Sequence, residues 1–273
     1  MTSVAVAYSV AAGGGLIAGA VNAVAGGGSI VSFPALHAIG LSSVRANITN
    51  IVALTPGYFS GTHAQRADLE HERVRFRRLA PVAAAGGLLG SVLLIVVSAA
   101  TFKQLVPFLI LFACALLLAQ NRLRSLMEQR RVRVATVPGA SPRPTSAAID
   151  DRSARDPSPG WGQRLVVFAF SIYGGFFGAG LGIMLLAVLG LFSDAGLARN
   201  NAVKQALSVV ISVIAATFLA FSGHVEWTYA AIMAVTSTIG GAIGGRVVNF
   251  VNPAMLRVGV VLLGCAVAAR YWA

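Results

Sequence analysis

The sequence predicts an all-α polytopic membrane protein made of two inverted-topology repeats of about five helical segments each. Of its 273 residues, 56% are hydrophobic and only 11% are charged, and the mean hydropathy is +0.77. So few charges cannot cover the surface of a soluble protein of this length. Long apolar runs, together with a constant internal offset between similar residues, predict the repeats.

Ten apolar segments follow one another along the chain. They cover 4–25, 27–40, 46–63, 79–99, 104–121, 163–179, 181–193, 199–222, 227–247 and 254–271. Most approach the ~20 residues that cross ~30 Å of hydrocarbon. Segments 27–40 and 181–193 are shorter, so we expect re-entrant or tilted half-helices there. No basic region precedes the first segment, so we expect no cleaved signal peptide.

A shift of 154 residues aligns the two halves without a gap. It superposes Gly26 on Gly180, Gly28 on Gly182, Arg45 on Arg199, Asn47 on Asn201, Glu72 on Glu226, Gly86-Gly87 with Gly90 on Gly240-Gly241 with Gly244, and Lys103 on Arg257. One offset that holds through charged, amide and glycine positions indicates an internal duplication.

The duplication gives three parts: a first transmembrane repeat at 1–121, a linker at 122–162 and a second transmembrane repeat at 163–273. The linker is rich in Pro, Ser and Arg, which predicts a disordered basic cytoplasmic tether. A binding site for anionic lipid or a partner, made by its arginines, is the alternative.

Positive charge predicts the orientation of the halves. Loop 64–78 and the linker carry most of the arginines, so both should be cytoplasmic, whereas the equivalent loop 218–232 has no Lys or Arg and should be external. Equivalent loops on opposite faces mean that the halves are inverted. The side of the N-terminus stays open, because it depends on whether the short segments cross.

Clustered glycines interrupt the apolar runs near 26–28 and 178–182. Glycine disfavours helix interiors, so we expect broken helices whose free N–H groups and positive dipole ends favour an anion. Paired interruptions of this kind in two halves indicate the substrate site of a transporter. The alternative is that the glycines only allow close helix packing, which we assign to Gly86-Gly87 and Gly240-Gly241.

The candidate substrate-binding residues lie at these breaks and at the start of the third segment of each half. They are Asn22, Gly26, Gly27, Gly28, Ser29, Asn47, Asn50, Gly180, Gly182, Asn201, Lys204 and Gln205. Asn201, Lys204 and Gln205 share one helical face, and Lys204 would lie ~9 Å inside the helix start. Lys204 would either snorkel to the surface or give the pathway its positive charge.

Other chemistry is not expected. No nucleophile elbow, phosphate loop, paired carboxylates or metal-ligand spacing is present, so we expect no catalytic residues, metal or cofactor. The basic loops lack nucleic-acid-binding motifs. Cys114 and Cys265 fall in apolar segments and are expected to be inert core thiols. His37 would be either a proton relay or a packed side chain.

The stretch 19–36, Gly-Ala-Val-Asn-Ala-Val-Ala-Gly-Gly-Gly-Ser-Ile-Val-Ser-Phe-Pro-Ala-Leu, precedes Val-Arg-Ala-Asn-Ile-Thr-Asn, a basic loop and a duplicated second half. This pattern resembles the TauE/SafE sulfite-exporter family of membrane permeases over nearly the whole chain apart from the linker. That family is linked to movement of sulfite and sulfur-containing organic anions such as sulfoacetate, so the resemblance implies an anion permease. The second half departs from the pattern, with Gly178-Ala-Gly-Leu-Gly182 in place of three successive glycines.

We therefore expect a multi-pass permease of the inner (plasma) membrane that moves a small sulfur-containing anion such as sulfite or an organosulfonate by alternating access. Its partners would be the anion and the lipid bilayer, with no nucleic acid. Coupling to protons or sodium, and a homodimer, are left open. The alternatives are a permease for a metal cation or neutral metabolite, and a non-transporting membrane scaffold or membrane enzyme.

Overall fold

The computed structural model describes residues 3–24, 27–135, 159–193, 195–247 and 253–272, and helices are the only regular secondary structure in these ranges. The helices are α1 (Val4–Val24), α2 (Ser29–Ala38), α3 (Ser43–Ala64), α4 (Arg66–His71), α5 (Arg73–Val96), α6 (Ala99–Ala135), α8 (Trp161–Phe176), α9 (Leu181–Leu191), α10 (Leu197–Ala220), α11 (Trp227–Val247) and α12 (Pro253–Trp272). Each of the ten predicted apolar segments corresponds to one of them, so the all-helical fold class is confirmed.

Two predicted boundaries are wrong. Residues 64–78, expected as a loop, contain α4 and the start of α5, where the Arg75 side chain is buried within the protein. Residues 122–135, expected in the disordered linker, continue helix α6, since Leu, Arg, Glu, Gln and Met in this stretch favour helix. The rest of the linker up to residue 158 lies outside the described residues.

The helices are those of a multi-pass membrane protein. Within the described ranges, α1, α5, α6 and α10 are long and apolar enough to cross a bilayer, and α2, α9 and α11 contain shorter apolar stretches. Helix α3 is more polar than these helices. Its Asn47, Thr49 and Asn50 side chains are fully buried, so they face the protein interior and not lipid.

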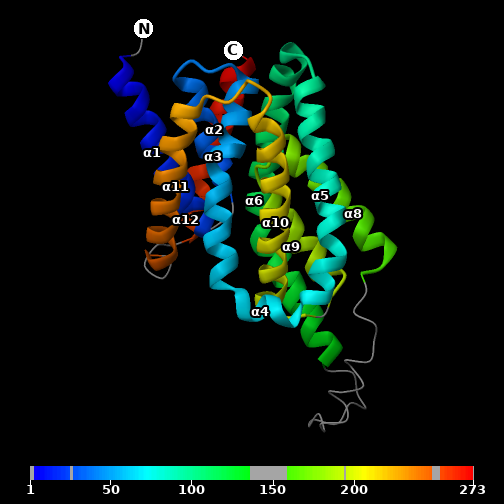
Figure 1. The fold of residues 1–273 in the computed structure, drawn as a ribbon. Coiled ribbons are helices and arrows are strands. Elements are labelled where there is room, and N and C mark those ends of the chain that lie inside the picture. The colour runs from blue at the N-terminus through cyan, green and yellow to red at the C-terminus, as the bar shows by residue number, and fades with distance from the viewer. Residues whose placement is uncertain (1–2, 25–26, 136–158, 194, 248–252, 273) are drawn as a thin grey trace.

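Paired helices organise the bundle. Helix α1 packs on α11, α8 on α5, and α6 on α12, while α3 packs on both α10 and α11, and α10 also packs on α5. Figure 1 shows their arrangement. Helices α3 and α10 run antiparallel, because Asn201 near the start of α10 donates to Gln65 just after the end of α3. The labelled N and C ends lie at the end of the bundle opposite α4 (Figure 1).

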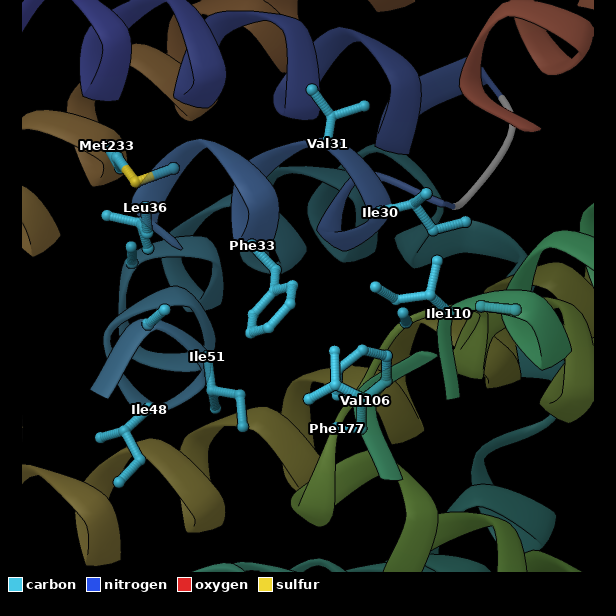
Figure 2. Close-up of a cluster of buried hydrophobic side chains, with 14 of the residues drawn as sticks. Ile30, Val31, Phe33, Leu36, Ile48, Ile51, Val106, Ile110, Phe177 and Met233 are labelled. Carbon is cyan, nitrogen blue, oxygen red and sulfur yellow. The ribbon is translucent and has the colours of Figure 1, made fainter. Parts of the chain in front are cut away.

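The two short helices fill the interior. Helix α2 packs on α1, α3 and α12, and α9 packs on α8, α10 and α6. Figure 2 shows Ile30 and Phe33 of α2 facing Ile110 and Phe177, and the Phe33 and Phe177 rings meet edge to face at 5.6 Å between centroids. The apolar face of α2 therefore anchors the first break against the second half of the chain.

Glycines allow the closest helix contacts. A Cβ on Gly90 would overlap the backbone carbonyl of Ile172 across α5 and α8, and one on Gly240 would overlap that of Leu16 across α1 and α11. Gly86 is similarly close to Phe168. The packing role expected for these glycine clusters is confirmed at Gly86 and Gly240, because small residues let helix backbones approach.

Candidate functional site

The first break separates α1 from α2 near Gly27 and Gly28, both of which are buried. Gly28 has helical backbone angles (φ −54°, ψ −37°), so its lack of a side chain is needed for space and not for an unusual conformation. A Cβ there would overlap the carbonyl oxygen of Ala18. Asn22, in the last turn of α1, is hydrogen-bonded to the Tyr58 side chain. Gly26 lies outside the described residues.

The second break separates α8 from α9 by a different means. Gly178 and Gly180 have φ of +79° and +78°, the left-handed region in which glycine is favoured. The Tyr173 hydroxyl donates to the carbonyl of Ala179 at 2.8 Å and fixes the loop. The predicted break at 178–182 is thus shorter by two residues, because Gly182 lies in the first turn of α9.

One small cavity lies between the two breaks. It is lined by Ser29, Asn50, Ile51, Leu54, Tyr58, Gly174, Phe177, Gly178, Leu181 and Ser212. These residues come from α2 and α3 of the first half and from α8, the second break, α9 and α10 of the second half. The cavity volume is about 20 Å³, which is space for about one water molecule.

Asn50 is the buried donor on the wall of this cavity. Its Oδ1 accepts from Ser32 Oγ, and the same hydroxyl oxygen lies 3.2 Å from the carbonyl oxygen of Gly28. Its Nδ2 is buried and has no hydrogen-bond partner among the described residues. Because a buried polar group without a partner is costly, an unpaired donor at a cavity wall indicates a site for an acceptor.

Asn47 has a different position. Its Nδ2 donates to the carbonyl of Phe176, the last residue of α8, at 2.8 Å. It is fully buried but does not line the cavity. Asn47 therefore donates to a helix-end carbonyl that the second break would otherwise leave without a hydrogen-bond partner.

The candidate residues of α10 lie away from the cavity wall. Lys204 extends along Gly182, since an added Cβ there would lie 3.7–3.9 Å from its Cδ, Nζ and Cε atoms. Asn201 donates to Gln65 Oε1 at 2.7 Å. Gln205 is half-buried, and neither it nor Lys204 lines the described cavity. The structure thus brings Ser29, Asn50 and the second break together and places the α10 group beside them.

Sequence reasoning missed Tyr58 and Ser212, which both line the cavity. They are 154 residues apart and therefore equivalent under the predicted duplication. Asn50, Leu54 and Tyr58 follow i, i+4, i+8 spacing, so one face of α3 meets the cavity. That spacing, read from the break outward, is a signal that could have found Tyr58.

Charged groups lie toward the two ends of the bundle. Arg45, at the start of α3, pairs with Glu226 before α11, and both side chains are partly exposed. Arg75, at the start of α5, is buried and donates to Asn200 Oδ1 at 2.8 Å and to the carbonyl of Leu189 at 2.9 Å. Each contact joins helices from different halves.

The remaining titratable side chains form no metal site among the described residues. His37 is stacked between Phe33 and Tyr271, and its Nδ1 lies 2.8 Å from the carbonyl of Leu41, as expected for a packed histidine. Cys114 is buried and Cys265 is exposed, so the expectation of core thiols is wrong for Cys265. Cys114 Sγ donates to the carbonyl of Val261 at 4.0 Å, across the contact between α6 and α12.

The family model described as sulfite exporter TauE/SafE matches residues 11–271. No solved structure matches the chain.

Three curated relatives cover nearly the whole chain. The probable membrane transporter protein YfcA of Escherichia coli (strain K12) is 21% identical over 262 residues, 93% of this chain and 86% of the relative. A probable membrane transporter protein, ORF9, of Sinorhizobium sp is 24% identical over 265 residues, with 93% and 88% covered. A probable membrane transporter protein of Haemophilus influenzae is 25% identical over 260 residues, with 94% and 91% covered.

Proposed function

Because the chain belongs to the TauE/SafE sulfite exporter family, we propose that it is a permease that carries a small sulfur oxyanion or sulfonate. The family and the curated relatives make it a membrane transporter. The choice of substrate comes from the chemistry of the cavity between the two breaks.

The observation that carries the proposal is the buried, unpaired Nδ2 of Asn50 at a cavity that is lined by Ser29, the first residue after the first break, and by Gly178 of the second break. The hydroxyls of Ser29, Tyr58 and Ser212 are further donors on the same wall. The charged oxygens of an oxyanion offer acceptor lone pairs, so a wall lined by such donors suits them once the halves part enough to admit the anion. The helix starts of α2 and α9 add positive dipole ends.

Lys204 is the counter-charge of the pathway in this proposal. Its side chain lies along Gly182 in the first turn of α9, so its ammonium reinforces the positive end of that helix. Asn201 and Gln205 lie on the same face of α10. They would guide the anion between the cavity and the end of the bundle near Gln65, to which Asn201 is bonded.

Alternating access needs two halves that rock against each other. The predicted inverted duplication is supported by the helix starts: α10, α11 and α12 begin 154 residues after Ser43, Arg73 and Ala99, where α3, α5 and α6 begin. Helix contacts repeat in the same way, since α1 packs on α11 as α8 packs on α5. The cavity would then lie near the axis that relates the halves.

We place the protein in the inner membrane with the α4 end in the cytoplasm. Arg66, Arg73, Arg77 and Arg78 cluster at that end, whereas Ser222–Glu226 at the other end carries no Lys or Arg. The start of α1 and the end of α12 lie at the end opposite α4 and would then both be external (Figure 1). Proton or sodium coupling and dimerisation stay proposals.

Sulfite uptake into proteoliposomes tests the function. Wild-type protein should accumulate sulfite, and Asn50→Ala and Lys204→Gln should each lower the uptake rate about tenfold or more. The first removes a donor in the cavity, and the second removes the positive charge beside the path that leads to it. Thr238→Ala is the matched control, since Thr238 is exposed on α11 and bonds only within its helix.

The unfolding midpoint of each variant in detergent shows whether the fold is kept. Wild-type vesicles that move a divalent cation or a neutral metabolite, but neither sulfite nor a sulfonate, would contradict the proposal. Wild-type uptake by the Lys204→Gln variant would remove that side chain from the pathway.

A further inference from the structure

The cavity between the breaks is lined by neutral polar groups. Ser29, Tyr58 and Ser212 bring hydroxyls, Asn50 brings an amide, and the other lining residues are apolar or glycine. Hydroxyls can accept as well as donate, so this wall can hold both a bare and a protonated oxygen. The chemistry therefore suits an anion of low charge.

The charge of the ligand decides the cost of burial here. The Born cost of removing an ion from water grows with the square of its charge, so a dianion costs roughly four times as much as a monoanion of the same size. Hydrogen bonds from neutral donors do not grow in that proportion, because each is an interaction with a dipole. A cavity lined by Asn50 and hydroxyls thus favours the monoanion.

Asn50 is one of the positions at which the two halves differ in charge. It is equivalent to Lys204 under the offset of 154, just as Gly28 is equivalent to Gly182. Asn50 is linked through Ser32 to the carbonyl of Gly28, and Lys204 lies along Gly182. At this position the first half has an amide, which lines the cavity. The second half has an ammonium, which lies against the start of α9.

We propose that Asn50 makes the cavity selective for a singly charged oxyanion, so that the protein carries hydrogen sulfite or a sulfonate monoanion and rejects the dianion. This rests on the proposed function and adds the charge class of its substrate. Since Ser32 occupies Asn50 Oδ1, the amide offers the cavity only its N–H donors. A lysine at the same position would add a full charge.

Methanesulfonate and sulfate separate charge from shape. Both are tetrahedral and of similar size, but the first is a monoanion and the second a dianion at neutral pH. With the full-length protein in proteoliposomes at fixed ionic strength, methanesulfonate should compete with labelled sulfite at least tenfold better than sulfate. Sulfite uptake should fall as pH rises through neutrality and the dianion forms, whereas methanesulfonate uptake should stay level.

The variant Asn50→Lys tests the residue. It should raise the competition by sulfate relative to methanesulfonate about tenfold, and Asn50→Gln, which keeps an amide, should keep the wild-type order. Equal competition by the two anions in the wild type overturns the inference. This comparison does not need the variants, so the test stays decisive even when Asn50→Lys folds poorly. An unchanged ratio in a folded Asn50→Lys also overturns it. Wild-type vesicles that take up no anion at all overturn the proposed function instead.

Discussion

Asn47 of α3 donates through Nδ2 to the backbone carbonyl of Phe176, the residue at which α8 ends. This hydrogen bond joins the first half of the chain to the break of the second half. Both groups are in the protein interior, where a lost donor leaves a carbonyl without water to replace it. The bond therefore fixes where α8 stops and where the loop to α9 begins.

Asn47→Ala should lower the free energy of unfolding by about 1–3 kcal/mol, because the Phe176 carbonyl loses its donor. Asn47→Asp should be worse, since it keeps the size but puts a carboxylate beside the carbonyl. Thermal unfolding of the full chain in detergent measures both. Equal stability of the wild type and Asn47→Asp would show that this bond does not hold the break.

Gly28 is predicted to be irreplaceable for steric reasons. Gly28→Ala should cost about 1–3 kcal/mol, because its Cβ would overlap the carbonyl of Ala18 and push α2 away from α1. Gly13→Ala is the control on α1, where no atom lies within 4 Å of the added Cβ. Gly13→Ala should be neutral or up to about 1 kcal/mol more stable, because alanine favours helix. Unfolding midpoints that rank the two variants in the opposite order would contradict this account.

Gly180 is predicted to be needed for its conformation. Its φ is +78°, and an added Cβ would meet its nearest atom at 3.5 Å, so space is not limiting. Gly180→Ala should therefore cost about 1–2 kcal/mol. Gly180→Asn should cost less, because Asn tolerates the left-handed region. Gly182→Ala, two residues on and within α9, is the control and should be neutral; a loss equal to that of Gly180→Ala would disagree.

Cys114 and Cys265 allow a test of how the two halves pack. Helices α6 and α12, which carry them, pack together, and Cys114 donates to the carbonyl of Val261, four residues before Cys265. They are the two cysteines of the chain. Copper-phenanthroline, an oxidant, should join them as a disulfide. After cleavage at a protease site placed within 136–158, the halves should migrate together on a non-reducing gel and apart on a reducing one. Cys265→Ser should abolish the link, and halves that always separate in the wild type would contradict the packing.

Much of the fold can be predicted because it depends on local sequence. Apolar length gives the helices, and the offset of 154 residues found from Arg45, Asn47 and Glu72 recurs in the starts of three helix pairs. The positions of the breaks follow from glycine, since helix propensity is a property of single residues. The reason for glycine at each break cannot be predicted in this way. Gly28 is needed for close approach to α1 and Gly180 for a left-handed backbone, and both depend on what packs nearby.

The cavity wall could be predicted only in part. Ser29 directly follows a glycine break, and Asn50 is three residues from another amide, Asn47, so the sequence indicates both as site residues. Ser212 is a lone hydroxyl in an apolar helix, where such groups usually bond to their own backbone. Its place at the cavity results from the packing of α10 on α3. The sequence predicts Arg75 as a loop charge, because its partners in the structure, Asn200 and Leu189, are more than a hundred residues away.

The central claim is that the two breaks enclose one anion site between the halves. Thiol labelling tests it most directly, with Ser29→Cys and Ser212→Cys made separately in a Cys114→Ser, Cys265→Ser background. Ser98→Cys, which is exposed between α5 and α6, is the control. Methanesulfonate should slow labelling at positions 29 and 212 to a similar extent and leave position 98 unchanged. Labelling at 29 and 212 that proceeds equally fast with and without the anion would contradict the account.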